Sequence, residues 1–365
     1  MTDLCTSGGS IEELRKVIDA TDTELFGLLE KRAKLARSIG KLKAAGAVYK
    51  PEREREIFER TVARAKAEGT LLSEEAIRNI VREIVSACRA VEALPCVAFL
   101  GPKGTFTEEA VVRQFGSSFK ALACGSLDEV FHEAASGTAD FAVVPVENST
   151  EGIVTRTADL LLTTPLKVIG EVNVAVHHNL MNRSGKREDI VEVHAHPQAL
   201  AQCRIWLMTH LPQAKLVPSS SNAQAAKEAA ADPKVSALAA ERAAALYGLH
   251  IAAHAVEDDP RNCTRFLVLG KEAGRKAQNV LHKTSLIFSV PNRAGALLDA
   301  LAPFAKYKVS MVRLESRPAR NGAWDYNFYV DVDGHIEDEP IAKAIDELGH
   351  IALYLKLLGS YTAAY

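Results

Sequence analysis

The first part of the chain has the apolar spacing of α-helices. Over residues 11–42, apolar side chains recur every three or four positions, which predicts one long amphipathic helix. Pro51 suits the first turn of a second helix, and Ser73 is a suitable N-cap for a third, which ends near residue 93. Three helices of such unequal length cannot bury the apolar stripe of the first one alone. We therefore expect the first helix to pair with a second chain.

After Pro95 the pattern changes to apolar strands that alternate with helices, which is typical of an α/β domain. The expected strands are 97–100, 141–146, 190–194, 216–217 and 265–269, and the expected helices are 107–115, 153–162, 197–210 and 223–231. Several turns from a strand into a helix would present unpaired N–H groups, and such a setting suits carboxylate ligands.

A polar stretch, 271–283, separates this region from the last one, which has the order strand, helix, strand, strand, helix, strand. The strands are expected at 285–290, 309–316, 325–332 and 351–358, with helices at 295–307 and 340–348 and a turn at Asn321-Gly322. This order predicts a small ferredoxin-like βαββαβ sandwich. The expected fold class is therefore multidomain, an all-helical region followed by α/β regions.

Composition and charge exclude several classes of protein. The 365 residues carry a formal net charge of -2, which gives no electrostatic case for nucleic acid or an anionic membrane as a partner. No apolar run approaches the roughly 20 residues that a membrane helix needs, and residues 1–10 lack the pattern of a signal peptide. The cysteines are scattered without a C-x-x-C pair, which argues against a zinc site or a disulfide framework. We expect a cytoplasmic protein with reduced thiols, no metal and no cofactor.

Three basic residues of the first helix are candidates for binding an anion. Arg32 and Lys43 are eleven residues apart, so they share a helix face at a distance of about 16 Å along the axis. Arg15 lies about 42 Å from Lys43 on the same helix, so a partner helix is needed to bring all three to one ligand. On spacing alone, a solvated basic face is the better explanation.

The helical segment resembles the all-helical chorismate mutases, which are intertwined dimers with active sites shared between chains. The resemblance is carried by Leu14-Arg15, Ile18-Asp19, Arg32, Leu35-Ala36, Ile39-Gly40, Lys43 and Pro51-Glu52-Arg53-Glu54. It implies that Arg15 of the partner subunit and Arg32 bind the carboxylates of chorismate. Lys43 would donate to the ether oxygen and Glu54 would accept from the ring hydroxyl. Further pocket positions are Arg53, Cys88 and Glu92.

Two positions of this segment depart from the family pattern. Many relatives have an acidic residue about where Lys50 falls, and many have glutamine in place of Glu92. Neither position anchors a carboxylate, so we still expect mutase activity. The rearrangement of chorismate to prephenate is pericyclic and needs a compact conformer and donors aimed at the ether oxygen, not a base or a nucleophile.

Four motifs occur in order in the α/β region. They are Gly101-Pro102-Lys103-Gly104-Thr105-Phe106-Thr107, Val144-Pro145-Val146-Glu147-Asn148-Ser149, His196-Pro197-Gln198-Ala199-Leu200-Ala201-Gln202 and Asn262-Cys263-Thr264-Arg265-Phe266. Each one alone is about equally well explained by a turn, a cap or a strand end, and the first is not a P-loop. Together they resemble prephenate dehydratase, a family with two α/β lobes around a cleft. That family removes the ring hydroxyl and CO2 from prephenate to give phenylpyruvate.

The resemblance assigns roles within this cleft. Thr264 would be the catalytic threonine that donates to the leaving oxygen, and Arg265 is a candidate for binding or supporting a carboxylate. Neutral donors and an apolar wall would line the rest, namely Thr105, Thr107, Asn148, Ser149, Gln202 and Asn262 as donors and Phe106 and Phe266 as the wall. A dry wall favours decarboxylation because charge spreads as CO2 leaves. One departure is Ala195, where relatives usually have serine.

The histidines are weighed separately because histidine is the usual proton carrier near neutral pH. His177 and His178 are expected on a strand, where adjacent side chains point to opposite faces, so they are poor joint metal ligands. His196 is expected to begin a helix and not to act as a base.

The last region resembles the phenylalanine-binding ACT domain of the same family. The matching residues are Asn292, Gly295-Ala296-Leu297-Leu298 and Glu315-Ser316-Arg317-Pro318. An edge strand blunted by charge and proline would explain the second tetrapeptide if it stood alone. With the βαββαβ order, the resemblance implies an L-phenylalanine pocket closed between two chains.

The expected domains are 1–94 (helical chorismate mutase), 95–273 (prephenate dehydratase) and 283–365 (ACT regulatory domain). Two alternatives stay open. One is an enzyme with dehydratase activity whose helical domain serves only dimerisation, and the other is a non-catalytic phenylalanine sensor. Use of arogenate as a further substrate also stays open.

Overall fold

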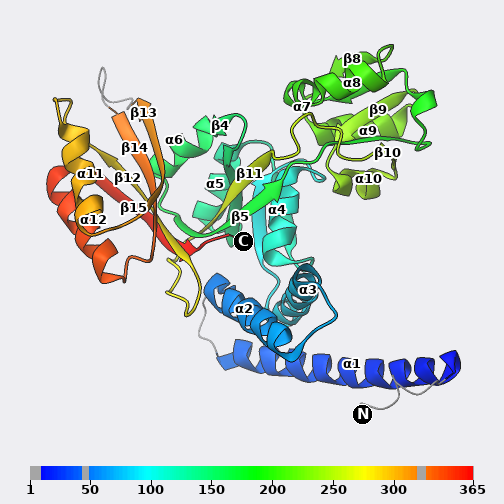
Figure 1. The fold of residues 1–365 in the computed structure, drawn as a ribbon, viewed down its shortest axis with the longest axis horizontal. Helices are drawn as coiled ribbons and strands as arrows, with labels where there is room; N and C mark the ends of the chain where they lie inside the picture. Colours follow the sequence, from blue (N-terminus) through cyan, green and yellow to red (C-terminus); the bar gives the residue numbers. More distant parts are fainter. Residues whose placement is uncertain (1–9, 43–48, 319–325, 365) are drawn as a thin grey trace.

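The computed structural model describes residues 10–42, 49–318 and 326–364. The first region consists of the helices α1 (Ile11–Leu42), α2 (Pro51–Glu68) and α3 (Glu74–Glu92). Figure 1 shows α1 passing beneath the other two and extending beyond them. The prediction of three helices is confirmed, and no helix in the described ranges is long and apolar enough to cross a bilayer.

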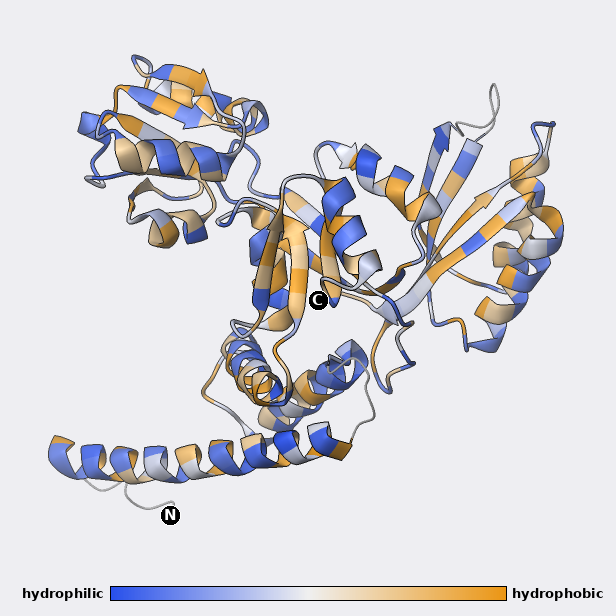
Figure 2. Cartoon of the chain, turned by 180° about the vertical axis from the view of Figure 1, so that it is seen from behind, coloured by the Kyte–Doolittle hydropathy of each residue, from blue (hydrophilic) through white to orange (hydrophobic). Residues whose placement is uncertain are grey.

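The first helix keeps its apolar residues exposed. No residue of α1 is buried within this chain, although hydrophobic residues recur along the length of this helix (Figure 2). The large exposed ones are Ile11, Leu14, Val17, Ile18, Leu25, Phe26, Leu28, Leu35, Ile39 and Leu42. α3, in contrast, buries Ile77, Val85 and Cys88. The apolar stripe of α1 therefore remains without cover among the described residues.

The α/β region has two lobes, each built on its own sheet. The first lobe has the strand order β2-β1-β3-β11-β5, with β4 paired to β3. Its elements are β1 (Cys96–Leu100), α4 (Phe106–Phe115), β2 (Lys120–Cys124), α5 (Leu127–Ser136), β3 (Phe141–Asn148), β4 (Gly152–Ile153), α6 (Thr155–Thr163), β5 (Lys167–Ala175) and β11 (Cys263–Gly270). The chain leaves this lobe after β5 and returns at β11.

The second lobe has the strand order β10-β6-β9-β7-β8. Its elements are β6 (Asn179–Asn182), a 3-10 turn (Arg187–Asp189), β7 (Glu192–Ala195), α7 (Pro197–Gln202), α8 (Arg204–His210), β8 (Lys215–Pro218), α9 (Asn222–Ala231), β9 (Val235–Ala239), α10 (Glu241–Tyr247) and β10 (His250–Ala253). The helix predicted over 197–210 is divided at Cys203, which ends α7 and precedes α8.

The strand predicted at His177 and His178 was wrong. Both residues lie between β5 and β6, where the chain crosses from the first lobe to the second. This segment makes backbone hydrogen bonds with the segment by which the chain returns to the first lobe before β11, and not with a sheet. The N–H of Val176 donates to the carbonyl of Asn262 at 2.8 Å, and that of Val256 donates to His178 at 2.8 Å.

The last region is the expected ferredoxin-like sandwich. Its elements are β12 (His282–Ser289), α11 (Ala296–Lys306), β13 (Met311–Pro318), β14 (Tyr326–Asp333), α12 (Glu339–Ile351) and β15 (Tyr354–Thr362). The strand order β13-β14-β12-β15 places the first and third strands of this region at the centre, as that fold requires. The turn predicted at Asn321-Gly322 lies outside the described residues.

This sheet packs against the first lobe and shares a hydrophobic core with it. Ile287, Tyr329 and Leu358 belong to one buried cluster with Val168 and Leu267 of the lobe. The closest approach is at Gly359, where an added Cβ would lie 2.2 Å from the carbonyl oxygen of Val168. Glycine is required there because backbone meets backbone.

Gly359→Ala is expected to lower the free energy of unfolding by about 1–3 kcal/mol, because the added methyl group must push the sheet away from β5. Chemical denaturation of the full chain measures the change. Gly349→Ala is the matched control, since its Cβ would meet only the side chain of Leu355 at an ordinary 3.5 Å. A Gly359→Ala protein as stable as Gly349→Ala would contradict the close packing of the two sheets.

Candidate active sites

A cavity of about 400 Å³ lies between the two lobes of the α/β region. Strand ends and helix N-termini of both lobes form its wall. Seven of the expected cleft residues line it, namely Thr105, Phe106, Thr107, Asn148, Gln202, Asn262 and Thr264. Ser149 supports this wall from outside, because its hydroxyl donates to Asn262 Oδ1 at 3.3 Å and accepts from the N–H of Cys263 at 2.9 Å.

The N-terminus of α4 is held in place from both lobes. Thr105 caps α4 by accepting from the N–H of Glu108 at 3.4 Å. The Glu108 carboxylate accepts from the N–H of Gly104 at 2.7 Å and pairs with Arg242 of α10 at 3.3 Å. Since α10 belongs to the second lobe, this ion pair ties the two lobes together beside the cleft.

The orientation of the Asn148 amide determines that the Thr264 hydroxyl accepts a hydrogen bond from it. Backbone N–H groups can only donate, and those of Thr150 and Glu151 donate to Asn148 Oδ1 at 3.0 and 3.2 Å. Nδ2 of Asn148 is therefore the donor to Thr264 Oγ1 at 2.9 Å and to Asn262 Oδ1 at 2.9 Å. The Thr264 oxygen accepts in this bond, so its own proton can be given to a ligand in the cleft.

The same reasoning extends along the wall to His178. Because Asn262 Oδ1 accepts, its Nδ2 donates to Gln202 Oε1 at 3.0 Å. Gln202 Oε1 is also 2.9 Å from His178 Nε2, which must then carry a proton. Burial lowers the pKa of His178, which favours the neutral ring with the proton on Nε2. His178 lines the cleft, although it was not assigned to the cleft from the sequence. A histidine in a segment between two lobes has no characteristic spacing that would reveal its hydrogen bonds.

The structure places Arg265 and Phe266 away from the cleft wall. Thr264 faces the cavity, so the next residue along β11 points to the other face. Arg265 donates to Glu171 at 2.7 Å, to Asp331 at 2.6 Å and to Tyr361 at 2.9 Å, so it lies at the contact with the ferredoxin-like sheet. Phe266 is buried in the core of the first lobe. We therefore do not assign substrate contacts to either residue.

The helical region brings some of the expected mutase residues together. Arg32 of α1 donates to the carbonyl of Ile84 on α3 at 3.4 Å, and Cys88 is buried on the same helix. A Cβ on Gly40 would lie 2.4 Å from Glu92 Cγ, so α1 and α3 are in close contact at this point. Two of the described residues are not brought in. Arg15 is exposed on α1, Arg53 points to solvent and pairs with Glu56 at 3.1 Å, and Lys43 lies outside the described residues.

Glu54 sits on the buried side of α2, next to a residue that sequence reasoning missed. Its carboxylate pairs with Arg89 of α3, which is 5% exposed. Burial raises the pKa of Glu54, while Arg89 and Arg32 act against this rise. Arg89 follows Val85 by four residues and so lies on the apolar face of α3. A charged residue within an apolar stripe is the sequence feature that could have identified it.

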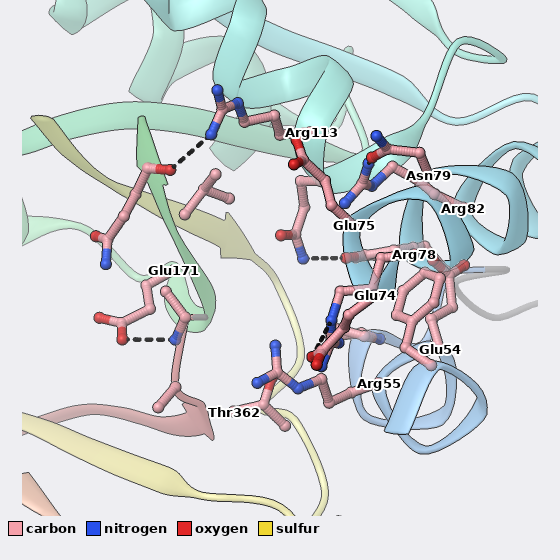
Figure 3. Close-up of a pocket in the computed structure, with 18 residues that line it drawn as sticks. Glu54, Arg55, Glu74, Glu75, Arg78, Asn79, Arg82, Arg113, Glu171 and Thr362 are labelled. Atoms are coloured by element: carbon pink, nitrogen blue, oxygen red, sulfur yellow. Dashed lines mark hydrogen bonds and ion pairs between the residues drawn. The ribbon is translucent and has the colours of Figure 1, made fainter. Parts of the chain in front are cut away.

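A larger cavity of about 610 Å³ lies where the three regions meet, and Glu54 is on its wall (Figure 3). Its lining includes four arginines and four glutamates from α2, α3, α4 and β5. Arg78 and Glu74 of this wall pair with each other at 2.6 Å, and others pair with groups beside it, for example Arg113 with Glu109 at 2.9 Å. This balance of charge gives the cavity no preference for an anion.

The expected effector residues lie on two segments of the last region. Gly295 precedes α11 with a φ of 80°, a conformation that favours glycine. Leu298 of the same motif is 72% exposed. On β13, Ser316 and Pro318 are exposed, whereas Arg317 pairs with Asp159 of α6 at 3.1 Å. The second motif therefore also touches the first lobe.

Three known families match consecutive parts of the chain, and these parts correspond to the three regions of the fold. Residues 14–93 match the family described as chorismate mutase type II, residues 97–274 match prephenate dehydratase, and residues 284–350 match the ACT domain.

Individual relatives cover almost the whole chain. The bifunctional chorismate mutase/prephenate dehydratase of Neisseria gonorrhoeae is 44% identical over 363 residues, which cover 97% of this chain and 99% of the relative. That of Aquifex aeolicus is 42% identical over 357 residues, or 97% and 98% of the two chains. The structure of prephenate dehydratase from Arthrobacter aurescens in complex with L-Phe matches with a TM-score of 0.68 at 35% identity, covering 73% of this chain and 89% of that one. This chain therefore belongs to the family of bifunctional chorismate mutase/prephenate dehydratases with a C-terminal ACT domain.

Proposed function

We propose that each activity of this enzyme of phenylalanine biosynthesis is carried by its own domain, with boundaries at 1–94, 95–273 and 283–365. The first would rearrange chorismate to prephenate, and the second would convert prephenate to phenylpyruvate. The third would bind L-phenylalanine and inhibit the second. The observation that carries the dehydratase assignment is the hydrogen-bonded chain from Asn148 to Thr264 within the cleft between the lobes.

In the dehydratase site, Thr264 donates its proton toward the ring hydroxyl of prephenate as that group leaves. Asn148 holds the threonine oxygen from behind, so the proton points into the cleft. The amide of Gln202 and the cap of α4 at Thr105 are neutral donors for the substrate carboxylates. The Phe106 ring lies edge-on to His178 at 5.6 Å between ring centres and forms an apolar part of the wall. Such a wall disfavours the localised charge of the departing carboxylate and so promotes loss of CO2.

In the mutase site, Arg32, Lys43, Glu54 and Glu92 of one chain would be completed by Arg15 of the partner subunit. The support is α1 itself. Its apolar residues are exposed along its full length, and Arg15 is about 26 Å from Arg32 along the axis. A second copy of α1 would cover the apolar stripe and supply the missing arginine, so we propose a homodimer. We also propose a cytoplasmic location, because the cysteines are scattered along the chain and do not form the pattern of a disulfide framework.

Thr264→Ala is expected to lower the dehydratase kcat by on the order of 10² to 10³, because one aligned donor is lost from a cleft with little water. The mutase rate should stay unchanged. Formation of phenylpyruvate from prephenate and loss of chorismate report the two activities separately. The control is Thr163→Ala at an exposed position of α6. A Thr264→Ala rate within about threefold of the Thr163→Ala rate, a small change against that expected loss, would remove Thr264 from the mechanism.

Arg15→Ala and Lys43→Ala proteins are each expected to be nearly inactive as mutases. When the two are mixed and their chains exchange, activity should return, because one site of each mixed dimer then has both residues. Loss of chorismate measures the recovery, and subunit exchange is followed independently with differently tagged chains. Proven exchange without recovery would show that the site is not shared between subunits.

Leu298→Lys is expected to raise the L-phenylalanine concentration for half inhibition of the dehydratase at least about tenfold, since allosteric coupling is typically worth 1–3 kcal/mol. The uninhibited rate should not change. Leu353→Lys is the matched control, because Leu353 is 71% exposed in the same domain but outside the two motifs. Equal sensitivity of both variants to L-phenylalanine would place the effector site elsewhere.

A further inference from the structure

One face of α3 is attached to the C-terminal end of α4. Glu83, Ser86 and Arg89 are three residues apart, so they lie on the same side of the helix. Ser86 Oγ accepts from the N–H of Ser118 at 3.0 Å, and the Glu83 carboxylate accepts from the N–H of Ser117 at 3.2 Å. α3 belongs to the mutase domain and α4 to the dehydratase domain, so these contacts join the two.

Arg89 of α3 joins α4 to a second helix of the mutase domain, α2. One terminal nitrogen of its guanidinium donates to Glu54, and the other donates to the carbonyl of Phe115 in the last turn of α4. The C-terminal end of a helix favours a cation. The rings of Tyr49 and Phe115 lie 5.1 and 5.8 Å from the guanidinium carbon, which adds attraction for the charge.

We propose that Arg89 is a positioning residue of the mutase site, which holds the Glu54 carboxylate against the dehydratase domain through the end of α4. This inference rests on the proposed role of Glu54 as the acceptor for the ring hydroxyl. A guanidinium suits this task because its two terminal nitrogens are rigidly spaced, so it can bridge two acceptors at a fixed separation. A lysine at this position could contact two acceptors only from one atom, so it would not hold them at the same fixed separation.

The consequence concerns both activities. α4 carries Thr105 and Thr107 of the dehydratase cleft at its first turn and the Arg89 contact at its last. One helix of ten residues therefore has one end at each site. The mutase geometry then depends on the position of a helix that belongs to the other catalytic domain.

A double-mutant cycle on the full chain tests whether Arg89 acts through Glu54. We expect Arg89→Met to lower the mutase kcat/KM by on the order of 10², as misplacement of a contact group by about 1 Å does. In a Glu54→Gln background, Arg89→Met should change kcat/KM by less than about threefold, because the group that it positions is already altered. Arg64→Met, at a surface ion pair of α2, is the control.

The outcomes separate this inference from the mutase assignment. Equal losses from Arg89→Met in both backgrounds would mean that Arg89 acts by stability alone, and would overturn the inference. A wild-type chain that does not consume chorismate would overturn both the mutase assignment and the inference. Arg89→Lys keeps the charge and protects the test against poor folding of Arg89→Met. The loss of mutase kcat/KM expected for Arg89→Lys is smaller than for Arg89→Met, and it should again appear only in chains that keep Glu54. A wild-type kcat/KM for Arg89→Lys would refute the proposed bridge from Glu54 to α4.

The same defect can be introduced from the dehydratase side. A Cβ on Gly116, directly after α4, would lie 2.5 Å from Ser86 Cβ, so Gly116→Ala should push α4 away from α3 and lower the mutase kcat/KM. Gly248→Ala is the matched control, because Gly248 has a similar φ of 68° but nothing within 4 Å of its added Cβ. Equal mutase rates for the two variants would show that the position of α4 does not govern the mutase site.

Discussion

The antiparallel register between β3 and β11 is the constraint on which the α/β region depends. Thr264 lies opposite Asn148, and Arg265 lies opposite Glu147. Because side chains alternate along a strand, this pairing sends one pair into the cleft and the other toward the ferredoxin-like sheet. A slip of one residue would exchange the two faces and place charges in the cleft and neutral groups at the domain contact. One strand pair therefore specifies a neutral cleft wall and a charged junction at the same time.

That junction is buried, and its charges are closely matched. Arg265 bridges Glu171 of β5 and Asp331 of β14, Lys283 of β12 pairs with Glu171 at 2.7 Å, and Arg313 of β13 pairs with Glu147 at 3.0 Å. Removing one member of a buried ion pair leaves an uncompensated charge, which costs about 3–5 kcal/mol, so the network strongly disfavours partial separation of the sheets. A displacement of the ferredoxin-like sheet must therefore carry β11 with it or break several of these pairs together. Since Thr264 directly precedes Arg265, such a displacement also acts at the dehydratase cleft.

The sequence alone was sufficient for features set by local periodicity. The three N-terminal helices and the ferredoxin-like order followed from apolar spacing, and the cleft residues Thr105, Asn148 and Thr264 followed from their motifs and are found on one cavity. β9 was missed because all five of its residues are buried and two are alanines, so it has neither alternation nor a strong strand preference. The environments of His178, Arg265 and Arg89 arise from contacts between segments 24 to 96 residues apart, which no local pattern encodes.

The two proposed catalytic sites differ in what they demand of quaternary structure. The dehydratase wall is assembled from one chain, and its hydrogen-bonded sequence from Asn148 to His178 is continuous within that chain. The mutase residues on α1 cannot meet within one chain, because a straight helix keeps Arg15 and Arg32 about 26 Å apart. A helix that exposes apolar residues along its whole length is also stable only when something covers them. The same pairing of chains that covers α1 would therefore complete the mutase site. The contact of Arg89 with α4 would then tie each chain's part of that site to a dehydratase cleft that needs no second chain.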